Sequence, residues 1–300
     1  MISAEQFCRD VRYAWRGCGR ARGVTAAPVL TLTVGVAGAT LMFTLIEGVL
    51  LRPLPVRQQD RLLVAWKALP SGGLAHFPFR VHEIDAIRRE SQLLEDVAAL
   101  GYNGSGPSVA VEGGAASYIS TASVTGDFFR VIGVDAILGR TLNRADDVTG
   151  AENVVVISNG LWQRRYGRSP DAIGRRLIID QQPFTIVGVA PPDFAIPRGV
   201  EAWMTTAASA STVTNPAFRE GARNDIDLIA RLRPGATIEQ ARSELHALMR
   251  SLEATASPHT ERDLEPVVQS YEDLVVGEVR SAMLLLFGAV GLVLLIAVAN

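Results

Sequence analysis

The sequence predicts a mixed α/β (α+β) domain held outside a membrane between two transmembrane helices. Two runs without any ionisable side chain, 26–46 and 282–299, are long enough to cross a bilayer. Between them, short segments of strand composition alternate with amphipathic helical segments, which favours mixed sheets with a βαβ-type subdomain. The overall composition, 48% hydrophobic and 20% charged, lies close to globular averages and decides little.

The first 25 residues predict a cytoplasmic amphipathic helix lying on the membrane surface. Phe7, Val11, Trp15 and Cys18 recur at helical spacing, with arginines around them. Arginines next to an apolar face suit an anionic lipid surface, so membrane lipid is an expected partner. An ordinary cytosolic extension that happens to be amphipathic is the alternative.

Residues 26–51 are expected to form the first transmembrane helix. At about 1.5 Å per residue, the uncharged run makes a helix of roughly 30 Å, the thickness of the hydrocarbon core. A cleaved signal peptide is the alternative, but the run is longer than a signal-peptide core and no small-residue cleavage site follows Ile46. Arg52-Pro53-Leu54-Pro55 then ends the helix.

Four positions in these segments are candidates for packing or coupling. Trp15 anchors the surface helix, whereas Gly35 and Gly38 belong to a small-residue stripe that lets a second helix approach closely. Glu47 is the acid at the outer end of the first span, where it reaches the interface or takes part in coupling. No catalytic, cofactor-binding or metal-binding residue is assigned.

The distribution of positive charge predicts a cytoplasmic N-terminus. The arginines before the run outnumber those after it; they are Arg9, Arg12, Arg16, Arg20 and Arg22 against Arg52, Arg57 and Arg61. Residues 52–280 are therefore expected to be periplasmic or extracellular. Both cysteines, Cys8 and Cys18, precede the span, so no disulfide is expected in the exported domain.

The second apolar run predicts a transmembrane helix over 281–300. A membrane helix that stops at Asn300 without polar flanking sequence leaves its last carbonyl groups at the membrane boundary. The sequence is therefore expected to be the N-terminal part of a longer inner-membrane protein, with the second span truncated.

The first half of the outer domain is predicted from local patterns. A strand is expected at 62–66 and an amphipathic helix at 80–94. The Gly/Ser-rich stretch 101–108 predicts a turn, followed by short strands at 109–111 and 118–124.

The second half carries stronger signals. Strands at 176–180 and 183–189 predict a β-hairpin, although Gln181-Gln182 is a poor turn pair. Residues 205–225 lack periodicity and predict a loop or subdomain boundary. A strand at 227–232 precedes a helix opened by Thr237, whose spacing from Gln240 is that of a capping box, and 264–269 is the expected partner strand of this βαβ-type unit.

Residues that could support catalysis do not form a convergent pattern. The chain has no phosphate-binding loop ending in Gly-Lys-Ser/Thr, so any ATP hydrolysis is expected from a separate partner. The scattered histidines lack metal-ligand spacing, and Gly104-Ser105-Gly106 lacks the spacing of a serine nucleophile. Asp146 and Asp147 are expected to be solvated acids in a polar loop. No enzymatic activity, cofactor or nucleic-acid partner is predicted.

Several blocks, in order along the chain, resemble the MacB-like permeases of ABC transporters, and more closely the branch described as duplicated orphan permeases. They are Asp-Val-Arg-Tyr-Ala at 10–14, Val-Leu-Leu-Arg-Pro-Leu-Pro at 49–55, Val-Thr-Gly-Asp-Phe-Phe at 124–129, Leu-Gly-Arg at 138–140, Val-Val-Val-Ile-Ser at 154–158 and Phe-Thr-Ile-Val-Gly-Val-Ala-Pro-Pro-Asp-Phe at 184–194. Ala39 and Gln181-Gln182 depart from the pattern, which puts one helix contact and one turn in doubt.

The resemblance implies a periplasmic core domain, two further spans, and a dimer or an internally duplicated pseudo-dimer. It also implies a separate cytoplasmic ABC ATPase whose cycle moves the outer domain, in export or in mechanotransmission. A two-span sensor or receptor ectodomain would have the same topology and is the main alternative. A membrane-tethered hydrolase is disfavoured by the absence of a nucleophile, base or metal pattern.

Overall fold

The computed structural model describes residues 56–69, 76–112, 115–192, 194, 196–208, 226–255 and 264–274, together with scattered helical residues within 33–44 and 285–295. The chain divides into two compact units, one of Met1–Arg52 with Val275–Asn300 and one of Pro53–Leu274. Each unit is treated by itself, and the second contains the folded domain.

In the first unit, the described residues are helical. The hydroxyl groups of Thr40 and Thr44 donate to the main-chain carbonyls of Val36 and Thr40, each at 2.9 Å, as threonine does inside helices. Within the described part of the chain, no helix has both the length and the apolar character needed to span a membrane. The predicted surface helix and both predicted spans fall largely outside the described residues and stay predictions.

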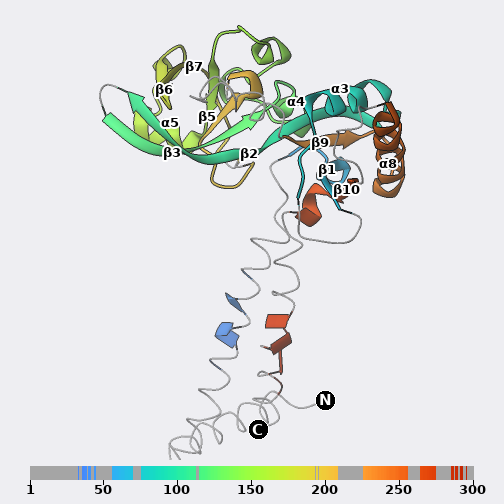
Figure 1. Ribbon diagram of the computed structural model, residues 1–300. Helices are drawn as coiled ribbons and strands as arrows, with labels where there is room; N and C mark the ends of the chain where they lie inside the picture. The colour runs from blue at the N-terminus through green and yellow to red at the C-terminus, as the bar shows by residue number, and fades with distance from the viewer. Residues whose placement is uncertain are drawn as a thin grey trace, which may run out of the picture. The chain divides into compact units, whose positions relative to one another are not determined.

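The folded unit begins with a lobe built from two interleaved split βαβ units, which we call the split βαβ lobe (Figure 1). Its elements are β1 (Leu62–Ala68), α3 (Val81–Glu90), the first part of β2 (Leu94–Glu112), β9 (Ile226–Leu232), α8 (Ile238–Thr255) and β10 (Glu265–Ser270). The strand order is β10-β1-β9-β2, with antiparallel neighbours. The predicted succession of strand, capped helix and strand is confirmed as β9, α8 and β10, although β10 pairs with β1 and not with β9. The elements β1, α3 and β2 form a second such unit.

Both helices of this lobe form as their sequences predict, except at one end. Thr237 Oγ1 accepts from Gln240 N, and Gln240 Oε1 accepts from Thr237 N at 2.9 Å, so the predicted capping box opens α8. The expected helix over 80–94 is too long: α3 ends at Glu90 because Ser91 adopts an extended conformation. Leu94, expected in the helix, instead starts β2 and is buried in the lobe's core.

The second lobe is a closed six-stranded barrel, which we call the barrel lobe. Strands pair in the cycle β2-β3-β8-β5-β7-β6 and back to β2. Its elements are the second part of β2, β3 (Ala115–Val124), β4 (Leu138–Gly139), β5 (Val154–Ile157), α5 (Asn159–Tyr166), the 3-10 turn η4 (Pro170–Ala172), β6 (Arg176–Ile179), β7 (Gln182–Val189) and β8 (Ala202–Thr205). Because the barrel is closed, none of these six strands is an edge strand.

The predicted turn at 101–108 is wrong, because β2 runs through it. Its first part, from Leu94 to Gly101, pairs with β9, and its second part, from Ser105 to Glu112, pairs with β3. The glycines and serines coincide with a register irregularity between Leu100 and Ser105, where β2 passes from one lobe to the other (Figure 1). Pairing with neighbouring strands therefore overrides the local turn preference.

The β6–β7 hairpin is confirmed, but its turn lies one residue earlier than predicted. Asp180 and Gln181, not Gln181 and Gln182, occupy the two turn positions, both with positive φ, 46° and 69°. Two successive left-handed residues are the signature of a type I′ turn, in which aspartate is favourable. Asp180 Oδ1 also accepts from Val109 N at 2.8 Å, which ties this turn to β2.

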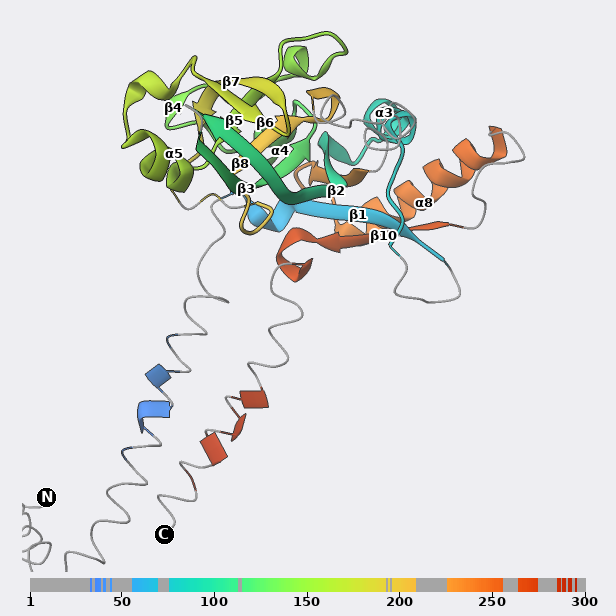
Figure 2. The same cartoon turned by 60° about the vertical axis from the view of Figure 1, so that its left-hand side comes forward.

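A short helix, α4 (Phe128–Ile132), lies between the two lobes in both views (Figures 1 and 2). Phe128 and Phe129 meet edge to face, with ring centroids 5.5 Å apart. Phe129 also packs on Phe194 and Trp203, at 5.4 and 5.9 Å. This buried aromatic group fixes α4 against the barrel lobe.

Candidate functional site

A cleft of about 970 Å³ lies where the two lobes meet at α4. Its lining includes Arg88 of α3, Asp96 of β2, Asp127 and Arg130 at α4, and Arg144 of the 3-10 turn η3 (Arg144–Asp147). A smaller pocket of about 220 Å³ lies between α3 and the barrel lobe and shares Arg88, Asp127 and Arg144. We call the five residues Arg88, Asp96, Asp127, Arg130 and Arg144 the ionic clasp.

Asp127 is the centre of the clasp. Its carboxylate is buried and accepts from Arg130 Nη2 at 2.8 Å and from Arg144 Nε at 2.6 Å, while Arg88 Nη2 lies 3.8 Å away. Burial acts to raise its pKa, but the hydrogen bonds and charges of Arg130 and Arg144 outweigh burial and hold the pKa below its usual value. Asp127 is therefore an ionised structural anion and not a proton donor at neutral pH.

A second contact of the clasp crosses between the lobes. Arg130 of α4 donates through both terminal nitrogens to Asp96 of β2, with 2.9 Å from Nη2 to Oδ1. Because Arg130 also binds Asp127, one guanidinium joins the strand of the split βαβ lobe to the start of α4. Arg130 and Arg144 are more than half exposed, so solvent screens these pairs and each contributes modestly to stability.

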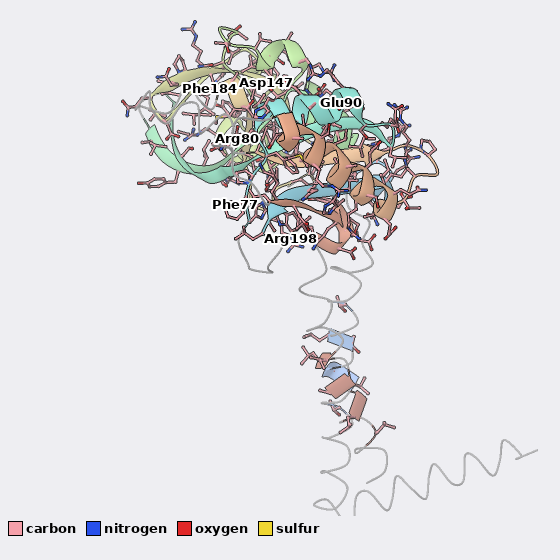
Figure 3. The ribbon with its side chains drawn as sticks, turned by 45° about the vertical axis from the view of Figure 1, so that its right-hand side comes forward. Phe77, Arg80, Glu90, Asp147, Phe184 and Arg198 are labelled. Carbon is pink, nitrogen blue, oxygen red and sulfur yellow. The ribbon has the colours of Figure 1, made fainter. Side chains whose placement is uncertain are left out.

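Asp146 and Asp147 were expected to be solvated, and this is wrong. Asp146 accepts from both Nη atoms of Arg140, at 2.6 and 2.8 Å, and from Asn143 N. Asp147 accepts from Gly126 N at 3.1 Å and from Thr206 Oγ1 at 2.9 Å. The two acids fasten η3 to the segment before α4 and to the end of β8, and Figure 3 shows Asp147 between Phe184 of β7 and Glu90 of α3 in this view.

The described lining of the cleft carries arginines and aspartates but no histidine or cysteine. Among the described residues, no three His, Cys, Asp or Glu side chains are grouped as a metal site requires. His76 lies in the split βαβ lobe, where Nε2 is 2.8 Å from Asp227 Oδ1 and the ring stacks on Trp66 at 5.0 Å. The arrangement can hold the lobes at a set angle, or release them, by breaking and remaking ion pairs.

The predicted packing or coupling positions all belong to the first unit of the chain, and their roles stay predictions. Trp15, Gly35 and Glu47 are outside the described residues, whereas Gly38 is helical and half-buried in the first unit. Asp127 was present in the quoted block 124–129, yet nothing local distinguished it from a solvated acid. Long-range pairing created its role, and sequence reasoning missed it.

The first and last strands of the folded unit, β1 and β10, are paired with each other. Leu63, near the start of β1, is the register partner of Ser270, the last residue of β10. The preceding residues 56–61, which we call the lead-in segment, end in the 3-10 turn η2 (Gln59–Arg61). After β10, Tyr271 is buried, which raises its pKa to about 12 despite the opposing charge of Arg198, labelled in Figure 3.

One family model matches most of this chain, and solved structures share its fold. A family model described as the MacB-like periplasmic core domain matches residues 25–248. The periplasmic region of MacB from Actinobacillus actinomycetemcomitans superposes with a TM-score of 0.55 at 14% identity, covering 74% of this chain and 94% of that one. The extracellular domain of the noncanonic ABC-type transporter YknZ from Gram-positive bacteria gives 0.51 at 14% identity, covering 69% and 99%. The search of curated proteins finds no match.

Proposed function

The chain belongs to the MacB-like periplasmic core domain family, and on that premise we propose that it passes movement between a separate cytoplasmic ABC ATPase and its outer domain. Its folded unit is the periplasmic or extracellular domain of a MacB-like permease. The proposed step is mechanical: the ATPase cycle moves the two predicted spans, and their movement rearranges the folded unit, in export or in mechanotransmission.

The pairing of Leu63 with Ser270 is the observation that carries this proposal. Because these residues are direct neighbours in the β1–β10 ladder, the two connections act on adjacent points of one sheet. A change in the separation of the spans would load this strand pair first, since six register pairs hold it together from Leu63 to Ala68. The sheet then transmits the load as a rigid body to β9 and β2.

The movement is expected to change the relative position of the two lobes at the inter-lobe cleft. In the described part of the chain, β2 is the strand that pairs in both lobes, and its register is irregular at the crossing. Paired strands on either side are stiff, whereas an irregular glycine- and serine-containing crossing and a partly exposed ionic clasp can change shape. We expect the lobes to rotate about this crossing as the clasp opens and closes.

The remaining parts of the proposal rest on the family assignment. The N-terminus is placed in the cytoplasm and residues 52–280 outside, with a bacterial inner-membrane location and lipid contact of 1–25. Two such units are needed to face an ATPase dimer, so the protein is proposed to act as a dimer or as a duplicated pseudo-dimer. No catalytic role is proposed for this chain.

Spin-label distances test the proposal. Nitroxides on Arg89→Cys of α3 and Gln163→Cys of α5, both exposed and one in each lobe, report the separation of the lobes in a Cys8→Ser, Cys18→Ser background. In the membrane-reconstituted protein with its ABC ATPase, the distance should change between the nucleotide-free and ATP-bound states. A control pair, Arg89→Cys with Ala247→Cys on α3 and α8 of the same lobe, should not change.

A distance that stays the same in both nucleotide states would refute coupling. A response to a soluble ligand without any ATPase, together with a signalling domain encoded after Asn300, would favour the two-span sensor instead. Two further apolar spans in that following sequence would support the permease.

A further inference from the structure

Arg231 is a buried arginine whose charge has no carboxylate partner among the described residues. It lies on β9, 6% exposed, and its guanidinium binds main-chain carbonyls instead. Nε and Nη2 donate to Val131 O at 3.0 and 2.7 Å, and Nη2 donates to Ile132 O at 3.1 Å. Nη1 donates to Arg57 O at 2.6 Å and, more weakly, to Gln58 O at 3.4 Å.

Such a group is unfavourable as a purely structural device. Burial lowers the pKa of Arg231, and the nearby charge of Arg61 lowers it further, while the charges of Glu95 and Asp96 oppose this shift without cancelling it. A buried charge without a direct ion pair costs free energy, and an apolar side chain of similar length would fill the same space at lower cost. An apolar side chain cannot donate hydrogen bonds, whereas the planar guanidinium group of arginine donates to several carbonyl groups at once.

The carbonyls that Arg231 binds belong to two segments far apart in sequence. Arg57 and Gln58 are in the lead-in segment, whereas Val131 and Ile132 form the C-terminal end of α4. The same two segments also meet directly, since Arg57 N donates to Ile132 O at 3.1 Å. Arg231 therefore holds three pieces together: the lead-in segment, α4 and β9.

Gly133 allows this close approach. It follows α4 with a φ of +77°, and a Cβ atom built there would lie 2.5 Å from Arg57 Cβ. An L-residue would meet both an unfavourable backbone conformation and a collision with the lead-in segment. The contact between α4 and the lead-in segment thus depends on the absence of a side chain at this position.

The other end of α4 is the ionic clasp. Asp127 precedes the helix and is bound by Arg130 and Arg144, and the helix between Asp127 and Gly133 contains five residues. A body this short, packed through Phe128 and Phe129, moves as one piece. Displacement of its C-terminal end must therefore reach the clasp at its N-terminal end.

We infer that Arg231 is the positioning residue that couples the lead-in segment, through α4, to the ionic clasp of the inter-lobe cleft. The inference rests on the proposed function for the origin of the movement. The contact itself does not depend on any ATPase: weakening the hydrogen bonds of Arg231 should weaken the ionic clasp in the resting protein as well.

Amide hydrogen exchange of the membrane-reconstituted protein tests the coupling without nucleotide. Arg231→Lys keeps the charge, but one ammonium group cannot reach all four carbonyl groups. We expect exchange to become about tenfold faster in the lead-in segment and in residues 140–147, which do not contact Arg231, while β5 and β7 stay unchanged. Gly133→Ala, which separates α4 from the lead-in segment but retains the arginine, should give the same pattern.

Arg61→Lys is the matched control. Arg61 also anchors the lead-in segment, with Nε donating to Leu232 O at 2.8 Å. Among the described residues its hydrogen bonds go to Leu232, Gln58 and Glu95, and none goes to α4. Its substitution should accelerate exchange in residues 56–61 alone. The coupling is overturned if Arg231→Lys leaves 140–147 unchanged, if it accelerates β5 and β7 equally, or if Arg61→Lys affects 140–147 as strongly. Loss of the nucleotide response in the wild-type protein would instead count against the proposed function.

Discussion

Arg144 Nε donates to Asp127 Oδ2 at 2.6 Å, and this contact joins the start of α4 to η3 across the edge of the inter-lobe cleft. Arg130 binds the other carboxylate oxygen at 2.8 Å, so the acid is held between two arginines. The charge of Asp127 therefore balances cations from more than one element, and its removal has effects beyond one pair.

Asp127→Asn should destabilise the folded unit by about 1 kcal/mol, because it removes two charged hydrogen bonds to arginines whose other sides are screened by solvent. Urea unfolding followed by circular dichroism measures the change. Asp135→Asn is the matched control, since Asp135 lines the same cleft but is exposed. It should stay within about 0.5 kcal/mol of wild type, and equal effects of the two substitutions would contradict the role of the clasp.

Acid should remove the contribution of Asp127. Its pKa in the folded state lies below the ordinary value of 3.8, so its stabilising effect is complete above that value and is lost as pH falls through the lower, folded-state pKa. The free energy of unfolding, measured from pH 6 downward, should therefore fall less steeply below about pH 4 in Asp127→Asn than in wild type. Identical slopes would show that Asp127 is not linked to folding.

Gly188→Ala should be severely destabilising, by about 3 kcal/mol or more, because its new Cβ would lie 1.9 Å from Arg140 O. The collision is with main-chain atoms, which cannot move without disturbing the β4–β7 pairing. Gly150→Ala is the control: it has a φ of +88° but nothing within 4 Å, so it should cost about 1 kcal/mol. The midpoint temperatures of thermal unfolding measure both effects: Gly188→Ala reports the steric collision, and Gly150→Ala reports the backbone strain alone.

Gln181→Gly should stabilise the barrel lobe by about 0.5–1 kcal/mol, because Gln181 has a φ of +69° and glycine adopts this conformation without strain. Gln182→Gly, one residue later and already in β7, should do the reverse, since a strand interior gains nothing from glycine. A chemical-denaturation midpoint that falls for Gln181→Gly would contradict the type I′ assignment.

A reporter enzyme fused after residue 150 should be active only when exported. The arginine bias around the first predicted span and the family membership both place this region outside the cytoplasm. A reporter pair with opposite compartment requirements measures it, and a fusion at residue 20 serves as the cytoplasmic control. Cytoplasmic activity of the fusion after residue 150 would refute the topology.

The local patterns of the sequence determined the elements whose signal is complete within a few residues. The capping box of Thr237 and Gln240, the β6–β7 hairpin and the strand at Leu62 follow from side-chain spacing alone, as does the expectation of two membrane spans. The short sequence blocks, in their order along the chain, also indicated the family. These features depend on neighbours in sequence, which a single chain displays directly.

Tertiary pairing decided the rest. Whether Gly101 belongs to a turn or to β2 depended on β9 and β3, which lie far away in sequence. In the same way, Asp127 and Arg231 are an ordinary acid and an ordinary base until folding buries them against Arg144 and against the carbonyls of α4. The cost of burying charge makes such positions matter, and burial is a property of the assembled fold and not of local sequence.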